Sequence, residues 1–552
     1  MLSIYAKYKM ILVLLIVLML IVSISIAYGY QKEDYTITIT GSFPLYTDPA
    51  VGSNSIEASV LFNLYDPLVF PALDGKIVPY LTTDWKVSPD GLKYIFHIRK
   101  GAKFHDGSEV RAEDVAFSMN RLLAIGQGFA YLYMDYVKNA EVIDDYTVQF
   151  NMKKTFGPFI PSLVRFYVLN KDLIMEHIKK PGPYGEMGDY GKEWLLTHDA
   201  GSGPYMMVEM KMEESMLASK FDDYWKGWEK NAPEYFKVLN WCNPVTVRVL
   251  MEQRELSITD EWQSIENLNN LDRIKGVDVA MMSTGSLVDI DINTKKPPTD
   301  DIHFRKALAY LTDYDTVITN IYPNARRAVG PCARAYQGHN PNVMLYEFNK
   351  DKALEELKKS KYYSELDKYP VTLAWSADVP DEEKLALLLQ ANASELGINI
   401  EILKQPWVTM TKEVETIETT PNAAILLVGD SYNEVGSVLA LRYHSRTAGT
   451  FTQFEWLLDD EIDKAIEDSL STLDKEERFK KYAELQEKLV ELCPTIWVCE
   501  FDERRAYQSG YISWLAADYA KEGKLNCPIM GRVIYLPEMK VYPEKRAKLL
   551  GK

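Results

Sequence analysis

Residues 79–121 read PYLTTDWKVSPDGLKYIFHIRKGAKFHDGSEVRAEDVAFSMNR, and this stretch decides the fold more than any other part of the chain. Apolar and polar residues alternate over 94–98, directly after a Pro-Asp-Gly turn at 89–91, and this pattern predicts a half-buried strand. A second turn at 105–107 precedes acidic residues that suit a helix N-terminus from Ala112 onward. The stretch therefore predicts a strand, a turn and a helix of a scaffold, and no active site is needed to explain it.

The positions of individual residues within this stretch also match the pattern of a known protein family. The residues that carry it are Pro79, Leu81, Trp85, Asp90, Gly91, Tyr94, Phe96, Arg99, Gly101, Phe104, His105, Asp106, Gly107, Ala112, Asp114, Val115 and Arg121. They resemble the signature region of the family 5 extracytoplasmic solute-binding proteins, which are the peptide, nickel and oligosaccharide receptors of ABC importers. Two positions depart from the family pattern, since Thr82 stands where Ala is usual and Arg111 where Thr is usual.

Further segments match the same family. Gly201 to Tyr205 (GSGPY) resembles its Gly-Thr-Gly-Pro-Tyr motif, with Ser202 in place of Thr. Asp289 to Leu311 resembles the segment at the crossing from the first lobe to the second, where Asp301 and Arg305 have the i, i+4 spacing that supports a helix. The resemblance covers Tyr35 to about Val541.

The composition describes a folded protein with several core-bearing lobes. The chain has 552 residues, of which 47% are hydrophobic and 26% charged. Its net charge of -17 argues against a nucleic-acid partner, because phosphate binding needs clustered Lys and Arg.

The N-terminus predicts export. Met10 to Ala27 is an uncharged apolar run preceded by Lys7 and Lys9, which should remain on the cytoplasmic side. Its length lies between that of a secretory signal and that of a membrane-spanning helix, so residues 1–34 are a signal peptide or an N-terminal membrane anchor. The first cysteine is Cys242, so the lipid-carrying cysteine of many relatives is missing. The body is expected to be extracytoplasmic, at the cell surface or in the periplasm.

Metal, cofactor and disulfide signals are weak. Five cysteines do not make a disulfide framework, and Cys493 and Cys499 flank a segment that, if extended, would hold them too far apart to pair. No zinc spacing and no H-E-x-x-H motif is present, so neither a metal nor a cofactor is expected.

The resemblance implies a two-lobed α/β fold like that of the periplasmic binding proteins (type II, cluster C-like), with an extra small domain and a hinge between the lobes. The implied boundaries are 35–70 and 201–294 for lobe I, 71–200 for the small domain, 295–509 for lobe II, and 510–552 for the return to lobe I and the C-terminal tail.

The segment after residues 423–428 is the first candidate for ligand binding. These six residues form a continuous apolar run, which is typical of a central buried strand, and the polar loop GDSYNE follows directly. In open α/β sheets, ligands bind beyond the strand ends. In peptide-binding relatives an Asp of this loop pairs with the peptide's α-ammonium, and Asp430 falls on it, with Gly429, Tyr432 and Asn433 as neighbours. The family Trp before it is missing here, and local capping by a turn Asp is the alternative role.

Two other segments are candidates for the cleft wall. Ser42, Phe43 and Tyr46 belong to the loop after the alternating strand TITIT, which in the family faces the ligand. Trp407 follows the alternating strand at 398–402, and it is either a cleft wall or an ordinary core or surface aromatic.

These features predict a receptor and not an enzyme. It would capture oligopeptides or dipeptides by closing its lobes and deliver them to the permease subunits of an ABC importer. The alternatives are the same role for an oligosaccharide or a nickel chelate and, from another class, a secreted hydrolase, for which no recognisable acid/base or nucleophile motif exists. A monomer is expected, and any retention at the membrane would come from the N-terminal segment itself.

Overall fold

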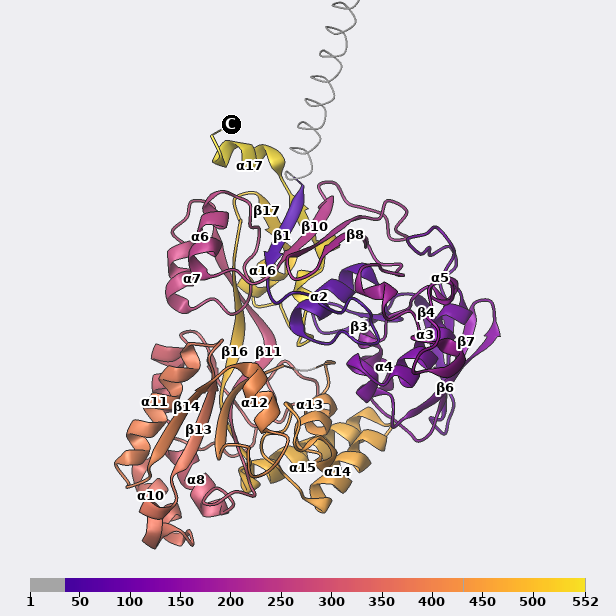
Figure 1. Ribbon diagram of the computed structural model, residues 1–552. Helices are drawn as coiled ribbons and strands as arrows, with labels where there is room; N and C mark the ends of the chain where they lie inside the picture. The colour runs from indigo at the N-terminus through magenta and orange to yellow at the C-terminus, as the bar shows by residue number, and fades with distance from the viewer. Residues whose placement is uncertain (1–34, 430, 552) are drawn as a thin grey trace, which may run out of the picture.

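The computed structural model describes residues 35–429 and 431–551, which form three bodies (Figure 1). We call them lobe I, the small domain and lobe II, and define each by its main sheet. The predicted signal or anchor at 1–34 lies outside the described residues. Within the described ranges, no helix combines the length and the apolar character needed to cross a membrane.

Lobe I contains the two ends of the described chain. Its sheet has the order β1 (Thr36–Thr40), β10 (Tyr235–Leu239), β9 (Ser215–Lys220) and β8 (Tyr205–Lys211), and β1 is the strand predicted from TITIT. Two small sheets pair β2 (Val69–Pro71) with β3 (Ile77–Pro79) and β17 (Ile512–Trp514) with β18 (Met539–Val541). Its helices are α2 (Ser55–Leu64), α6 (Pro244–Glu252), α7 (Ile265–Leu271), α16 (Leu515–Lys521) and α17 (Pro543–Leu549).

The small domain contains most of the signature stretch at residues 79–121. Its sheet has the order β4 (Thr82–Val87), β5 (Lys93–Ile98), β7 (Thr147–Met152) and β6 (Val137–Asp144), and its helices are α3 (Ala112–Ile125), α4 (Phe159–Ser162) and α5 (Lys171–Glu176). The predicted strand and helix are confirmed as β5 and α3, and the alternate residues Tyr94, Phe96 and Ile98 are buried on one face. The start of α3 is capped by Asp114, which accepts from the Arg111 N–H at 2.9 Å.

One buried ion pair joins the small domain to lobe I. Arg121, at the inner face of α3, donates from Nη1 and Nη2 to the two carboxylate oxygens of Asp48, at 2.7 Å and 2.6 Å. Both side chains are almost inaccessible to solvent. Bidentate pairing of this kind fixes orientation as well as distance, so the small domain is held rigidly against the loop that follows β1.

Lobe II is a six-stranded sheet covered by helices. Its strand order is β12 (Arg326–Arg327), β16 (Thr495–Tyr507), β11 (Asp278–Ile292), β15 (Ala423–Val428), β13 (Val371–Ser376) and β14 (Ile400–Gln405). The helices are α8 (Ile302–Leu311), α9 (Tyr314–Thr316), α10 (Lys350–Lys359), α11 (Asp381–Ser394), α12 (Trp407–Glu413), α13 (Val435–Arg442), α14 (Asp460–Ser471) and α15 (Lys475–Leu492). The apolar run at 423–428 is confirmed as an interior strand, because β15 lies between β11 and β13.

The long strands β11 and β16 connect the two lobes. They pair antiparallel from Asp278 opposite Tyr507 down to Asp291 opposite Thr495. Their register shifts between Met282 and Ser286, where Gly285 has a φ of +80° that disfavours any residue with a side chain. Because the ladder is interrupted at this point, the bulge is where the strands can bend, and we regard them as the hinge (Figure 1).

A buried hydroxyl cluster lies where the small domain meets lobe I. The Tyr80 hydroxyl is 2.5 Å from that of Tyr224 and 2.6 Å from that of Tyr535. Asp66 accepts from the Tyr224 hydroxyl at 3.1 Å and from the Trp225 indole N–H at 2.9 Å. Burial raises the pKa of Asp66 to about 7 in spite of these donors, because the carboxylate has lost its hydration.

The raised pKa of Asp66 predicts a pH dependence of stability. The folded state binds the Asp66 proton more tightly than the unfolded chain, so the contribution is present at low pH and is lost as the pH rises from about 4 to about 7. Asp66→Asn should remove this contribution, and the melting temperature of the variant should therefore fall less between pH 5 and pH 8 than that of the wild type. Parallel pH profiles of the two proteins would argue against the assignment.

Candidate functional site

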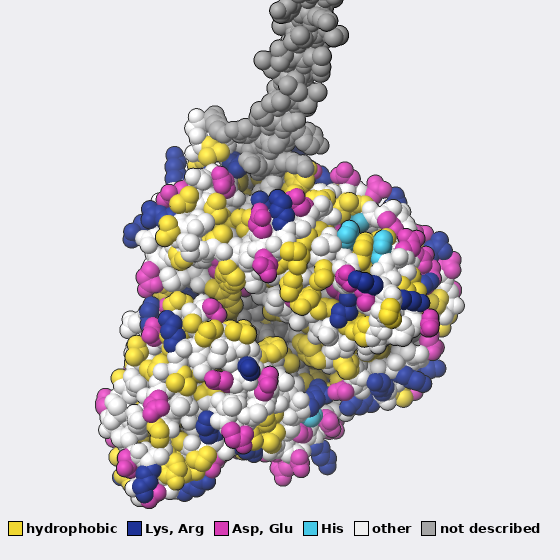
Figure 2. Space-filling view, in the orientation of Figure 1, with side chains coloured by type: hydrophobic (Ala, Val, Ile, Leu, Met, Phe, Trp, Pro, Cys, Tyr) yellow, Lys and Arg dark blue, Asp and Glu magenta, His cyan; other side chains and the backbone are white. Residues whose placement is uncertain are grey.

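The surface is hollowed between lobe I and lobe II (Figure 2). On the lobe II side, residues 429–434 follow the carboxyl end of the interior strand β15, at the position where open α/β sheets place ligands. On the lobe I side, residues 41–46 follow β1. The two loops predicted from the sequence thus leave the ends of strands that belong to different lobes.

Lobe II anchors its loop through Glu434. The carboxylate of Glu434 accepts from Arg478 Nε at 2.6 Å, from Arg478 Nη2 at 3.2 Å and from the Tyr482 hydroxyl at 2.8 Å. All three side chains are buried, and the two partners come from α15. Val435 at the start of α13 adds a backbone hydrogen bond to the Gln337 carbonyl at 3.0 Å. The C-terminal half of the loop therefore has a fixed position within lobe II.

The other half of the loop contacts the small domain and lobe I. Ser431 shares a side-chain hydrogen bond with the Tyr131 hydroxyl, and its carbonyl accepts from Arg165 Nε at 2.8 Å. Asn433 donates from Nδ2 to the Gly75 carbonyl at 3.1 Å. Lobe II is therefore in contact with the opposite side of the cleft in this structure, as expected for a closed arrangement.

Of the predicted residues in this loop, Asp430 lies outside the described residues. Gly429 is exposed, and a Cβ added to it would lie 3.2 Å from Ser286 Oγ at the hinge bulge. Tyr432 and Asn433 are each 1% exposed. The side chains of Tyr432 and Asn433 are packed within the protein, so a ligand could contact them only at the bottom of the cleft. Gly429, in contrast, is accessible to solvent.

The predicted residues of the lobe I loop lie beside the start of α2. Ser42 and Phe43 are half-buried, whereas Tyr46 is exposed. Glu57 holds the loop, because its Oε1 accepts from the Tyr46 N–H at 3.1 Å while Oε2 accepts from the N–H groups of Ser53 and Asn54 at 2.9 Å and 3.2 Å. Burial raises the pKa of Glu57 although these donors lower it.

Trp407 is the first residue of α12 and is 39% exposed. Its ring meets that of Phe451 edge to face, with 6.4 Å between the centroids, and Phe451 is 59% exposed. Two neighbouring exposed aromatic rings are an apolar surface of lobe II that a ligand or a partner can contact.

Sequence reasoning missed the contribution of Gly75, Tyr131 and Arg165. These residues precede the loop by hundreds of positions, and no local pattern joins them to it. One signal was available for Arg165, which is the only charged residue between Thr155 and Asn170. A single charge within such an apolar run indicates a buried ionic group that needs an explanation.

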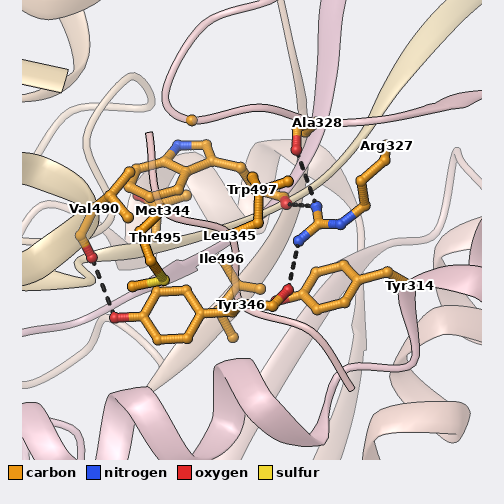
Figure 3. Close-up of a pocket in the computed structure, with 11 residues that line it drawn as sticks. Tyr314, Arg327, Ala328, Met344, Leu345, Tyr346, Val490, Thr495, Ile496 and Trp497 are labelled. Carbon is orange, nitrogen blue, oxygen red and sulfur yellow. Dashed lines mark hydrogen bonds between the residues drawn. The ribbon is translucent and has the colours of Figure 1, made fainter. Parts of the chain in front are cut away.

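A small pocket in lobe II is structural in character (Figure 3). The Arg327 guanidinium lies 3.4 Å from the centre of the Tyr314 ring. Arg327 donates to the carbonyls of Trp497 at 2.6 Å and Tyr346 at 2.9 Å, and the Tyr346 hydroxyl donates to the Val490 carbonyl at 3.2 Å. The polar groups of this pocket are therefore used to hold the edge strand β12 in place.

Chemically, the site offers backbone groups, hydroxyls and aromatic faces, which suits binding. Over residues 35–429 and 431–551 no cluster of His, Cys, Asp and Glu is arranged to hold a metal ion. No disulfide joins any two of the five cysteines, all of which lie within the described residues. Burial raises the pKa of the Cys493 thiol to about 11, which leaves it without nucleophilic character at neutral pH.

Comparison with solved structures shows the predicted fold. The peptide-bound ABC transporter-associated periplasmic binding protein DppA from Helicobacter pylori superposes with a TM-score of 0.75 at 20% identity, over 93% of this chain and 99% of that one. NikZ from Campylobacter jejuni, in complex with Ni(L-His), gives a TM-score of 0.75 at 17% identity, over 92% and 99% of the two chains. The type of fold predicted from the sequence, that of the periplasmic binding proteins, is confirmed.

Sequence comparison agrees with the fold. The probable D,D-dipeptide-binding periplasmic protein DdpA of Escherichia coli is 25% identical over 460 residues, which cover 81% of this chain and 85% of that protein. Residues 76–450 match the family described as bacterial extracellular solute-binding proteins, family 5 Middle, a family of binding proteins and not of catalysts. Because this match spans more than half of the chain, the protein belongs to the family 5 bacterial extracellular solute-binding proteins.

Proposed function

We propose that this protein is the receptor of an ABC importer and that it captures dipeptides or oligopeptides by closing its two lobes. The observation that carries the proposal is the position of loop 429–434, a polar loop at the end of an interior strand that meets the opposite side of the cleft. The names of relatives support the choice of ligand, since DdpA is described as binding D,D-dipeptides and the Helicobacter pylori protein holds a peptide.

In this mechanism an extended peptide lies between the lobes, with its main chain bonded to strand ends and its charged termini fixed by complementary groups. Asp430 pairs with the α-ammonium, and Gly429 leaves room for the peptide backbone beside it. Trp407 and the loop of Ser42, Phe43 and Tyr46 provide the walls. Closure then presents the loaded receptor to the permease subunits, and the hinge strands β11 and β16 bend to allow release.

Native mass spectrometry of ligand retained through purification tests the proposal. Dipeptides or oligopeptides are expected on the wild-type protein. Asp430→Ala is expected to lose most of the bound peptide, because truncating one partner of a buried charge pair typically costs about 2 to 5 kcal/mol. Asp460→Ala, at the exposed start of α14, is the matched control and should retain its ligand. Retention of sugars or a nickel chelate without peptide would contradict the peptide assignment, and sustained turnover of a peptide or sugar library would contradict a pure binding role.

We further propose that the receptor is a monomer held at the outer face of the membrane by its N-terminal segment. Met10 to Ala27 carries this proposal, because an uncharged apolar run of this kind that is not cleaved partitions into the bilayer. N-terminal sequencing of the native protein should begin at Met1 or Leu2. A mature N-terminus after Ala27 or later would identify the segment as a cleaved signal.

A further inference from the structure

Arg165 is a buried cation at the boundary between the small domain and lobe II. It follows α4 in the small domain, and its side chain is 0% exposed. Nε donates to the carbonyl of Ser431, which belongs to the binding loop of lobe II, at 2.8 Å. The contact joins two residues that are 266 positions apart in the chain, so it depends on how the bodies are arranged.

The groups around Arg165 that the structure describes do not include a negative charge that pairs with it. The guanidinium carbon lies 4.9 Å from the centre of the Phe129 ring and 5.5 Å from that of Phe62. Both terminal nitrogens are buried without a hydrogen-bond partner, and no ion pair joins Arg165 to any acidic residue within 35–429 or 431–551. The nearby Tyr167 is a neutral hydroxyl, since burial raises its pKa to about 12 although the Arg165 cation opposes that rise.

Three other arginines, each 1% exposed, are paired, whereas Arg305, which is 7% exposed, is held by backbone carbonyls. Arg121 has Asp48, Arg442 has Asp289 and Asp291, and Arg532 has Glu538. Arg165 differs from these three because the described residues offer it one carbonyl, two aromatic faces and the neutral Tyr167 hydroxyl, and no carboxylate, in place of its hydration. Removing a cation from water without a counter-ion is unfavourable, and a single hydrogen bond with cation–π contacts offsets only a part of that cost.

The unfavourable free energy of dehydrating Arg165 arises when lobe II closes. Ser431 covers Arg165 from the side of lobe II, whereas Phe62 belongs to lobe I and Phe129 to the small domain. When the hinge opens, Ser431 leaves and water regains access to the guanidinium. Closure without ligand must therefore dehydrate Arg165, and the free energy for this step has to come from ligand contacts.

We propose that Arg165 sets the ligand affinity of the receptor by making closure unfavourable in the absence of ligand. The proposal deepens the function proposed above, because it names the residue that keeps the empty receptor open. An empty receptor that closed by itself would compete with loaded receptor for the importer, so an open resting state serves transport. The attraction between Arg446 and Asp135 across the same boundary acts in the opposite direction, but this pair is partly exposed and screened by water.

Hydrogen exchange of the ligand-free full-length chain tests the proposal. Arg165→Met keeps the length and the aromatic contacts of the side chain and removes the charge. We expect the amides of 431–442 and 128–137 to exchange about tenfold more slowly than in the wild type, because the closed population rises. The affinity for an equimolar pool of dipeptides should increase about tenfold for the same reason. Arg165→Gln, which is also neutral, should shift both measurements in the same direction.

Two matched variants separate this effect from general stabilisation. Arg121→Met removes a paired buried arginine, so it should lower the melting temperature and should not slow exchange. Arg446→Ala removes the attraction across the boundary and should leave exchange equal to or faster than that of the wild type. Unchanged exchange in both Arg165 variants would overturn the proposal, and faster exchange would overturn it and identify Arg165 as a latch that holds the closed state. Slower exchange combined with no dipeptide binding by any variant would instead refute the peptide function and leave the role of Arg165 in closure supported.

Discussion

Arg442→Met is expected to lower the free energy of unfolding by about 3 to 5 kcal/mol, because it leaves buried carboxylates without their cation. Arg442 Nη1 donates to Asp289 at 2.6 Å, and Nη2 donates to Asp291 at 2.7 Å. The three side chains are almost fully buried. Since Asp289 and Asp291 are on the hinge strand β11 and Arg442 ends the helix that follows the binding loop, the cluster ties that loop to the hinge.

Glu455 completes this cluster, and its Oε1 lies 3.7 Å from Arg442 Nη2. Burial, with Asp291 as the second cause, raises the pKa of Glu455 well above its usual range. Its Oε1 accepts from the Thr495 hydroxyl of β16 at 2.7 Å.

Denaturant unfolding of Arg442→Met measures the loss. The control is Arg248→Met, which removes the exposed i, i+4 pair with Glu252 at 3.0 Å and should change stability by less than about 0.5 kcal/mol. If the two variants lost similar amounts of stability, the buried cluster would not have the importance assigned to it.

Glu434→Ala should have the second large effect. The substitution leaves Arg478 buried without its carboxylate, although the guanidinium retains the carbonyls of Thr472 and Leu473 at 2.9 Å and 3.1 Å. We expect a loss of about 3 kcal/mol in unfolding free energy. Ligand affinity should also fall, because Glu434 fixes the C-terminal half of the binding loop.

A double-mutant cycle separates the pair from its surroundings. The variant that combines Glu434→Ala with Arg478→Met contains neither charge, so it should recover most of the stability lost in Glu434→Ala alone. Additive losses in the cycle would show that the two residues do not depend on each other. The peptide affinities of the same variants then show how strongly binding depends on the position of the loop at 429–434.

Local sequence patterns predicted the elements well. The alternation at 94–98, the acidic start at Ala112 and the apolar run at 423–428 are confirmed as β5, α3 and β15. Each pattern depends on neighbours within a few positions, so the sequence contains the whole signal. The spacing of Asp301 and Arg305 was less informative. Asp301 caps α8, while Arg305 donates to the carbonyls of Cys493 and Leu492 and not to Asp301.

The domain boundaries and the individual ligand contacts stay predictions. Asp430, on which the sequence argument placed the ammonium contact, lies outside the described residues. The structure changes the interpretation of its neighbours, because Asn433 and Ser431 use polar groups on Gly75 and Tyr131 across the boundary. Such contacts leave no periodic trace in the sequence.

The sequence by itself determined the family, the type of each main element and the loop that leaves the end of β15, because these depend on local spacing and on motifs of the small domain. Only the tertiary structure decided that this loop spans two bodies, with Glu434 held by lobe II and Ser431 held by the small domain. It also decided that Arg165 is buried with no counter-ion among residues 35–429 and 431–551. The physical reason is that hydration and pairing of a charge depend on groups brought together from distant parts of the chain, and these groups meet only when the lobes are folded and closed.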